Sequence, residues 1–265
     1  MRYSQTETSN HESGRVPTNT SPKRLRFMRR FRFDLRTLML LFSGFIVALG
    51  IWSSRAARQR ELAAWVIASG GTPYYMNSSP MDELDSIFPT SWLRVLGVDY
   101  FHSIRRLHFE GKPVADYSRM SRLHTVQCAE FVSCDLQDFR DVSQLRNLRM
   151  LSIRENPLQS LDGIQQMRRL GGLVANNTRI DDLEPLRGHP TLSLLCLRNT
   201  PISDLGPLAD VANLRSLDLA HTNISDIAPL KSLSFLWTLN ISGTNIGDEQ
   251  IESLQAVLPN CEITR

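Results

Sequence analysis

Apolar residues recur along this chain with a period of 22 residues, from Ile104 nearly to the end. The unit reads L-x-x-L-x-L-x-x-(N/T)-x-(I/L)-x-D-(I/L)-x-x-L, and its clearest copies begin at Leu192 and Leu214. A fixed period in the twenties with this pattern predicts an α/β leucine-rich repeat solenoid, whose units bury their apolar faces against one another. Seven units keep the register, starting at Ile104, Val126, Leu148, Leu170, Leu192, Leu214 and Leu236.

Positions within the unit predict its local structure. The alternating L-x-L segment predicts one strand of a parallel sheet on the concave side. At the ninth position we expect a small polar side chain that turns inward and bonds the loop backbone. Aspartate at the thirteenth position predicts a helix cap, and the proline that follows in three units predicts a short 3₁₀ turn on the convex side. The ninth positions are Lys112, Cys134, Asn156, Thr178, Thr200, Thr222 and Thr244, and the aspartates are Asp116, Asp138, Asp182, Asp204, Asp226 and Asp248.

The seventh unit departs from the pattern in a way that suits the end of a stack. Its return segment predicts a helix whose apolar face holds Ile251, Leu254, Val257 and Leu258. Pro259 and Asn260 stop this helix, and residues 261–263 predict a final half strand. An atypical last unit is expected because the open end of a solenoid core must be covered.

Two further motifs carry a resemblance to a known group of proteins. Phe31-Arg-Phe-Asp-Leu-Arg-Thr-Leu38 precedes an apolar segment, and Leu258-Pro-Asn-Cys-Glu-Ile263 closes the chain. With the 22-residue repeats, this layout resembles bacterial leucine-rich repeat proteins that carry one N-terminal membrane anchor, and the repeats resemble those of internalins. The resemblance implies a fold and a location, and it implies neither a catalytic residue nor a cofactor.

Residues 37–54 are uncharged and are flanked by many arginines. As a helix they span roughly 27 Å, which is enough for the core of a bilayer. Because the heavier positive flank precedes the segment, we expect a signal anchor with a cytoplasmic N-terminus and an extracytoplasmic repeat domain. Three alternatives stay open: a cleaved signal peptide, a helix in a soluble core and the inverted topology.

Charge is divided unevenly along the chain. Residues 1–60 carry a net charge of +9, and residues 61–265 carry −6. Lipid head groups account for arginines beside an anchor, so we expect contact with the membrane and none with nucleic acid. Residues 1–22 contain almost no large apolar side chains, and we expect residues 1–36 to form a disordered, basic cytoplasmic tail.

Residues 55–103 predict a linker helix and an N-terminal cap for the repeats at 104–265. A helix is expected over 55–69 with Leu62, Trp65 and Val66 on one side, followed by a short strand at 73–76. Segments 82–88 and 91–96 also read as helical. We expect one aromatic and apolar group to cover the open end of the first repeat: Trp92, Leu93, Val95, Leu96, Tyr100 and Phe101.

The exposed positions of the sheet form the candidate binding site. A weakly charged central strip between charged ends is typical of a surface that binds an unidentified protein or peptide. The alternative is that isolated apolar residues on a sheet have no function. A second function class, a structural scaffold that associates with itself or with cell-wall polymer, stays open. The candidate partner-binding residues are Met150, Arg154, Val174, Asn176, Leu194, Cys196, Arg198, Asp218 and His221.

Catalysis and metal binding find little support in the residue pattern. Ser216, Asp218 and His221 lie close in sequence, but an open sheet provides no pocket in which a histidine would stand between the other two. The four cysteines lack metal-ligand spacing, so we expect no enzyme, cofactor or metal site. Cys196 is expected to be an exposed free thiol, and Cys134 to be buried.

Overall fold

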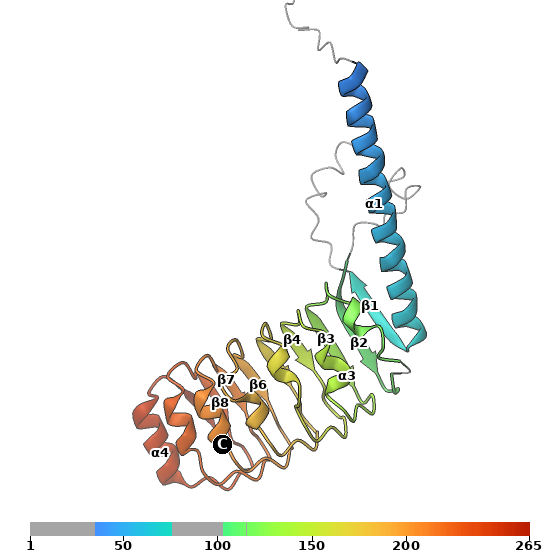
Figure 1. Ribbon diagram of the computed structural model, residues 1–265. Coiled ribbons are helices and arrows are strands. Elements are labelled where there is room, and N and C mark those ends of the chain that lie inside the picture. Colours follow the sequence, from blue (N-terminus) through green and yellow to red (C-terminus); the bar gives the residue numbers. More distant parts are fainter. Residues whose placement is uncertain (1–34, 76–102, 115) are drawn as a thin grey trace, which may run out of the picture. The chain divides into compact units, whose positions relative to one another are not determined.

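The structure is a computed structural model that describes residues 35–75, 103–114 and 116–265 (Figure 1). The chain divides into two units, Met1–Val47 and Ala48–Arg265. Helix α1 (Leu35–Ala68) belongs to both units and includes the helix expected over 55–69. The predicted helices at 82–88 and 91–96, and the aromatic cover from Trp92 to Phe101, lie outside the described residues.

A single sheet of nine strands runs through the second unit in chain order (Figure 1). All neighbouring strands are parallel except β1, which pairs antiparallel with β2. The structure thus confirms the strand predicted at 73–76, although the strand begins earlier, at Gly71. The strands are β1 (Gly71–Tyr75), β2 (Ile104–Glu110), β3 (Cys128–Val132), β4 (Met150–Ser152), β5 (Gly172–Val174), β6 (Leu194–Cys196), β7 (Ser216–Asp218), β8 (Thr238–Asn240) and β9 (Glu262–Thr264).

The strand register confirms the 22-residue period. Leu151 pairs with Leu173, and Leu195 pairs with Leu217, so the fourth positions of successive units lie side by side. The first, fourth and sixth positions are buried throughout the regular units, which makes one continuous apolar core. This stacking explains why the period is strict, because one added residue would turn a strand's apolar side chains to the opposite face.

The ninth position turns inward as predicted, with one exception. Asn156 is buried; its Oδ1 accepts the backbone N–H groups of Cys134 and Leu136, both at 2.9 Å. Its Nδ2 donates to three backbone carbonyls, including that of Phe131 at 2.8 Å. The threonines each donate one local hydrogen bond, such as Thr200 to the carbonyl of Leu197 at 2.6 Å. The prediction was wrong for the first unit, where the ninth residue is a long charged lysine that stays at the surface.

Short helical turns return the chain from one strand to the next. They are η3 (Met120–Arg122), α3 (Arg140–Ser143), η4 (Ile164–Gln166), η5 (Glu184–Leu186), η6 (Gly206–Asp210) and η7 (Ala228–Ser232). Aspartates bond the first residue of four of these turns, but they stand one residue before the N-cap where the sequence predicted the cap itself. Asp204 Oδ1, for example, accepts the N–H of Gly206, the first residue of η6, at 2.8 Å, while Leu205 holds the N-cap position. Asp248 is an exception, because it is already the first residue of α4 (Asp248–Val257) and Gly247 holds the N-cap position.

The eighth position has a left-handed backbone in every unit, a feature that sequence reasoning missed. Glycine and asparagine tolerate this conformation best, and their recurrence at this position was the available signal. The left-handed conformation turns the chain sharply out of each strand and leaves the ninth side chain facing inward. The residues are Gly111, Ser133, Glu155, Asn177, Asn199, His221 and Gly243.

Both ends of the core are covered by elements that differ from the repeats. At the first unit, Leu62, Trp65 and Val66 of α1 join the buried core, as predicted. At the last unit, α4 buries Leu254 and packs Ile251 against the core, and β9 forms the predicted final strand. Val257 was wrongly placed on the buried face: it is 51% exposed at the end of α4, while its neighbour Leu258 is buried.

Candidate binding face on the sheet

Two rows of outward side chains run across the parallel strands. The first row contains Met150, Gly172, Leu194 and Ser216, which are aligned by strand pairing. The second row contains Ser152, Val174, Cys196, Asp218 and Asn240. The structure therefore brings the predicted apolar residues Met150, Val174, Leu194 and Cys196 together on three adjacent strands.

Gly172 shapes the apolar part of this face. A Cβ atom at this position would stand 2.6 Å from Sδ of Met150 and 3.7 Å from Cδ2 of Leu194. The side chain of Met150 thus folds over the glycine and approaches that of Leu194. A flexible thioether over a gap is adaptable, which suits a surface that fits itself to a partner.

Val174 and Cys196 lie on the face, but they are half-buried rather than exposed. Neighbouring strands stand about 4.8 Å apart, so side chains in one row shield each other. Burial raises the pKa of the Cys196 thiol, and the charge of Asp218 adds to this shift. The thiol is free, as expected, but its raised pKa disfavours the reactive thiolate.

Polar pairs surround the apolar strip. On β2, His108 lies between two carboxylates, with Nδ1 3.0 Å from Oε2 of Glu130 and Nε2 3.2 Å from Oε2 of Glu110. Beyond the strip, the guanidinium of Arg198 lies 3.3 Å from Oδ2 of Asp218. Both ends of the strip are therefore charged yet internally paired, as the sequence interpretation expected for the rim of a binding surface.

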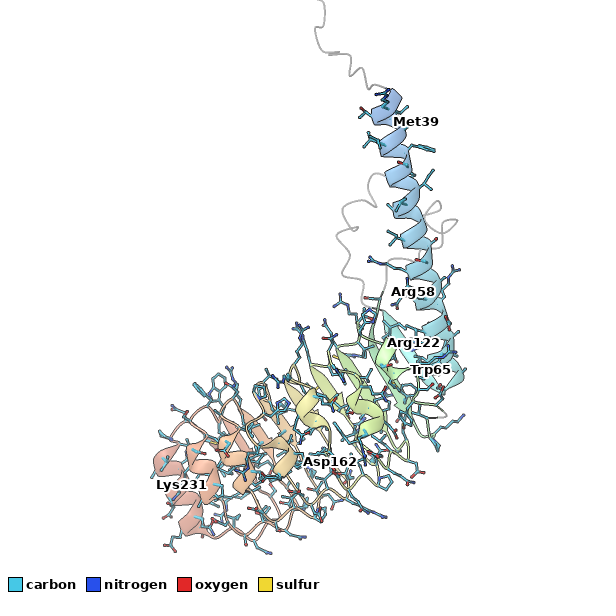
Figure 2. All side chains as sticks on the ribbon, viewed as in Figure 1. Met39, Arg58, Trp65, Arg122, Asp162 and Lys231 are labelled. Carbon is cyan, nitrogen blue, oxygen red and sulfur yellow. The ribbon has the colours of Figure 1, made fainter. Side chains whose placement is uncertain are left out.

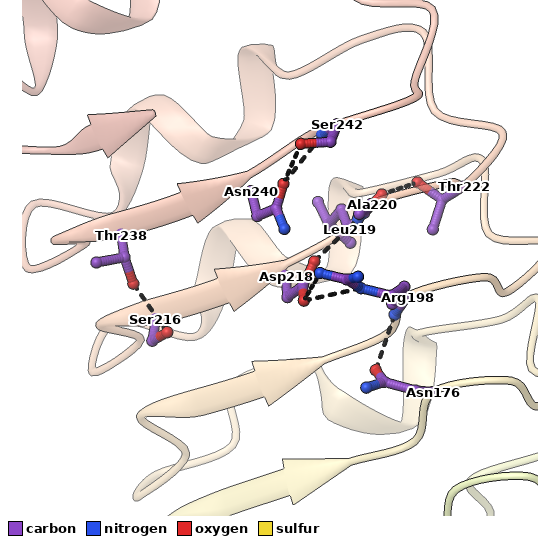
Figure 3. Close-up of polar contacts among 10 residues, drawn as sticks. All are labelled: Asn176, Arg198, Ser216, Asp218, Leu219, Ala220, Thr222, Thr238, Asn240 and Ser242. Carbon is purple, nitrogen blue, oxygen red and sulfur yellow. Dashed lines mark hydrogen bonds and ion pairs between the residues drawn. The ribbon is translucent and has the colours of Figure 1, made fainter. Parts of the chain in front are cut away.

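Arg198 is held from two sides (Figure 3). Oδ1 of Asn176 accepts its backbone N–H at 2.9 Å, and Oδ2 of Asp218 accepts from its guanidinium at 3.3 Å. Asp218 is itself fixed, because its Oδ1 accepts the N–H of Ala220 at 3.1 Å. Ser242 and Asn240 pair in the next unit, where the serine hydroxyl donates to Oδ1 of Asn240 at 2.7 Å. These bonds fix the side chains beside the strip before any partner arrives, which lowers the entropy cost of binding.

Arg154 and His221, the other candidates, lie at the end of the strands where the chain turns out of the sheet. Both are exposed. The ring of His221 lies over Gly243, where a Cβ atom would stand 2.3 Å from Nδ1. No hydrogen bond among the described residues joins His221 to Ser216 or Asp218; Ser216 instead accepts a bond from Thr238 at 2.8 Å. The structure therefore does not assemble these three residues as a catalytic triad.

Sequence reasoning overlooked an asparagine pair beside the strip. Nδ2 of Asn199 donates to Oδ1 of Asn177 at 2.9 Å, joining the left-handed positions of two units. The same position joins Ser133 to Glu155 at 2.7 Å. The recurrence of polar residues 22 residues apart was the signal for these contacts, because equivalent positions of successive units lie side by side.

The helical side of the stack carries a polar depression of about 530 Å³ between the second and third units. Asp138, Asp162, Arg140 and Arg179 are among the residues that line it. Within the described residues, no group of His, Cys, Asp or Glu is arranged to hold a metal ion. The depression is open and mixed in charge, so it identifies no particular ligand.

Comparisons with known proteins agree with this architecture. The family model described as leucine-rich repeats (2 copies) matches residues 190–232. None of the curated proteins matches the sequence. An internalin (inlF) from Listeria monocytogenes is 24% identical, with a TM-score of 0.53 over 60% of this chain and 48% of its own. Internalin C2 (inlC2) from the same bacterium is 24% identical, with a TM-score of 0.57 over 63% of this chain and 74% of its own.

A leucine-rich repeat protein of Leptospira interrogans is 19% identical, with a TM-score of 0.52 over 62% of this chain and 49% of its own. This chain thus spans about half the length of two of these three structures. The likenesses confirm the predicted bacterial leucine-rich repeat fold of the internalin kind. Leucine-rich repeat proteins of this kind generally mediate protein–protein interactions.

Proposed function

We propose that this chain is a membrane-anchored leucine-rich repeat protein that binds a protein or peptide on its sheet face and catalyses no reaction. The observation that carries the proposal is the contiguous strip of Met150, Val174, Leu194 and Cys196, bordered by fixed polar pairs. A surface with a charge-poor centre and a polar rim is the usual anatomy of a protein-binding site.

Helix α1 supports the membrane part of the proposal. By length and composition it qualifies as a candidate membrane span over Arg36–Ala68, with a mean hydropathy of 1.8 in its most apolar stretch. Large apolar side chains such as Leu40, Phe42 and Phe45 are more than half exposed along it. Lipid would remove this apolar surface from water, and the arginines before residue 37 favour a cytoplasmic N-terminus with the repeats outside.

The binding proposal is tested by photo-crosslinking in native membranes. A crosslinking amino acid replaces Arg154, which is exposed beside the strip, and in a matched control it replaces Gln165, which is exposed on η4. We expect an adduct with a different protein only from position 154. A second chain that also carries Val174→Arg and Cys196→Arg should fold normally by circular dichroism and lose the adduct.

Each result of this experiment has a distinct meaning. An adduct that survives the double arginine variant, or that forms equally from position 165, would move the site off the sheet face. Adducts formed only between copies of this chain would support a self-associating scaffold instead. The topology is checked separately: protease added outside intact cells should cleave the repeats and spare residues 1–36.

A further inference from the structure

The two edges of the sheet carry opposite charges in the first four units. Arginines gather just before each strand and at its first residues. These are positions nineteen to twenty-two of one unit and one to three of the next. The segments 122–128, 144–150 and 166–172 contain no aspartate or glutamate. We call these arginines the arginine edge: Arg105, Arg106, Arg122, Arg146, Arg149, Arg168 and Arg169.

The opposite edge, where the strands end, is acidic. Only two basic residues, Lys112 and Arg179, fall in positions eight to thirteen of these four units. A random scatter of charge would mix the signs at both edges, whereas here one edge is free of acidic residues and acidic residues predominate on the other over four successive strands. The carboxylates on this edge are Asp116, Asp135, Asp138, Glu155, Asp181 and Asp182.

The arginine edge is available to a ligand. Six of its members are exposed, and Arg105 is half-buried. Among the described residues none of the seven makes an ion pair; Arg146 only donates to the side-chain oxygen of Gln166, at 3.3 Å. Several other arginines of the domain are paired, as Arg187 is with Glu184 and Asp210, both at 2.7 Å. An unneutralised row of this kind attracts anions.

Two exposed aromatic side chains continue this edge in the later units. Phe235 is 54% exposed and Trp237 is 60% exposed, on either side of the buried Leu236. The guanidinium carbon of Arg215 lies 5.6 Å from the centre of the Trp237 ring. Exposed tryptophan next to arginine is typical of the interface between membrane and water, where an apolar ring and a cation are both accommodated.

Two contacts join the C-terminal part of α1 to the first unit. Nε1 of Trp65 donates to Asp116 at 3.2 Å, and Arg119 pairs with Glu61 at 2.8 Å. Asp116 and Arg119 stand at positions thirteen and sixteen of the first unit. As α1 is followed from Trp65 to Glu61 and toward Ser54, its contacts thus move toward the arginine edge, whose Arg122 stands at position nineteen (Figure 2).

The distance involved is short. Glu61 and Ser54, the last residue of the uncharged stretch, are separated by about 10 Å along a helix that rises 1.5 Å per residue. Both residues belong to the same unit as the repeats. The four strands β2 to β5 cover about 14 Å at the usual strand spacing. A bilayer crossed by residues 37–54 would therefore begin about 10 Å along the chain from Glu61, which contacts the first unit.

We propose that the arginine edge, together with Phe235 and Trp237, docks on the anionic lipid head groups of the membrane in which α1 is anchored. This inference rests on the anchoring part of the proposed function. Docking of the edge holds the repeats against the bilayer and leaves the sheet face and the acidic edge directed to the surroundings. Its chemistry is phosphate recognition by guanidinium groups, supported by insertion of two rings at the interface.

The test uses the full chain reconstituted in vesicles. A fluorescent amino acid replaces Ser234, next to Phe235 on the arginine edge, and in a control it replaces Ser203, which is exposed near the acidic edge. The vesicles contain a head-group spin label and either phosphatidylcholine alone or phosphatidylcholine with phosphatidylglycerol. We expect quenching at position 234 in the anionic vesicles, with little at position 203, and a loss of quenching at 1 M salt, where the Debye length falls to about 3 Å.

A charge-matched pair of variants assigns the effect to the edge. The edge variant carries Arg146→Gln, Arg149→Gln, Arg168→Gln and Arg169→Gln. The control variant removes the same charge elsewhere, by Arg140→Gln, Arg154→Gln, Arg179→Gln and Arg187→Gln. Because each arginine near an anionic surface contributes roughly fivefold to binding, the docking equilibrium should fall at least about a hundredfold in the edge variant only.

The possible results separate this inference from the anchoring on which it depends. A chain that fails to float with vesicles after alkaline washing overturns the anchoring. A chain that floats but shows equal quenching at positions 203 and 234, or equal loss in both variants, overturns the docking and leaves the anchoring intact. If quenching is absent and the edge variant instead loses binding to soluble polyphosphate, the edge serves a soluble polyanion and not the membrane.

Discussion

The third and fifth units carry different residues at the same inward position, and the difference shows how much one side chain can contribute to a repeat. Asn156 bonds five backbone groups, three of which belong to the preceding unit. Thr200 bonds one carbonyl of its own loop. The asparagine therefore joins two units, whereas the threonine only closes one turn.

The side chains that fill the core also differ between the early and the later units. The first two units fill their core with aromatic rings, and Phe109 and Phe131 stack with centroids 5.1 Å apart. The later units rely on leucine and isoleucine at nearly every buried position. At the junction with these units, Asn156 can satisfy both N–H and carbonyl groups of the loops, because its amide carries donors and an acceptor.

The largest effect is expected from Asn156→Ala. The substitution leaves the buried N–H groups of Cys134 and Leu136 without their acceptor and removes three bonds to carbonyls. Unsatisfied buried groups cost about 1–3 kcal/mol each, so we expect a loss of about 3–4 kcal/mol in unfolding free energy. Urea unfolding of the full chain in mild detergent, followed by circular dichroism, measures this loss.

Thr200→Val is the matched control, because it keeps the shape and removes one hydroxyl. It should cost about 1 kcal/mol. Asn156→Thr should fall between the two, since a threonine restores a local bond but cannot reach the preceding unit. Equal losses in Asn156→Ala and Thr200→Val would show that the bonds between units contribute nothing.

The comparison also shows what could be predicted from the sequence. The 22-residue period predicted the strands, the inward ninth residue and the 3₁₀ turns, because every unit repeats the same steric requirements. It could not show that Asn156 reaches back across a unit, because that contact depends on how two loops pack. For the same reason the half-burial of Cys196 and the fold of Met150 over Gly172 were missed, since both depend on neighbouring strands.

The distribution of charge could not be taken from the net charge. The value of −6 for residues 61–265 sums over both edges of the sheet and does not show where each sign lies. In the folded stack, equivalent positions of successive units line up, so arginines far apart in sequence gather on one edge. The period contained this information, but it becomes visible only when the residues are sorted by position in the repeat instead of by place in the chain.

A smaller effect is expected from His189→Leu. His189 occupies a position at which other units hold Leu145, Met167 or Val211, and it is 5% exposed with no hydrogen bond to either ring nitrogen. Burial lowers the pKa of this histidine. As the pH falls below about 6.5, His189 binds a proton in the unfolded chain but stays neutral in the folded chain. The wild-type protein therefore loses stability toward acid.

His189→Leu should remove this part of the acid sensitivity. Between pH 7 and pH 5 the wild-type should lose up to about 2 kcal/mol more than the variant. Urea midpoints at the two pH values measure the difference, and His124→Leu, at an exposed histidine, is the control. If the two variants have the same pH dependence, the buried histidine is not the source of the sensitivity.

The smallest effect contrasts a regular unit with the last one. Asp204 stabilises the start of η6 by accepting the N–H of Gly206, so Asp204→Ala should cost about 1 kcal/mol. Asp248 lies inside α4 and caps nothing; there it pairs only with Arg265 at the surface. Asp248→Ala should therefore shift the urea midpoint less than Asp204→Ala does. If Asp248→Ala instead shifts the midpoint more, the charge of Asp248 at the start of the longer helix contributes more than the direct hydrogen bond of Asp204 does. The last unit would then be stabilised by the interaction of a charge with the helix dipole, and the regular units by a hydrogen bond.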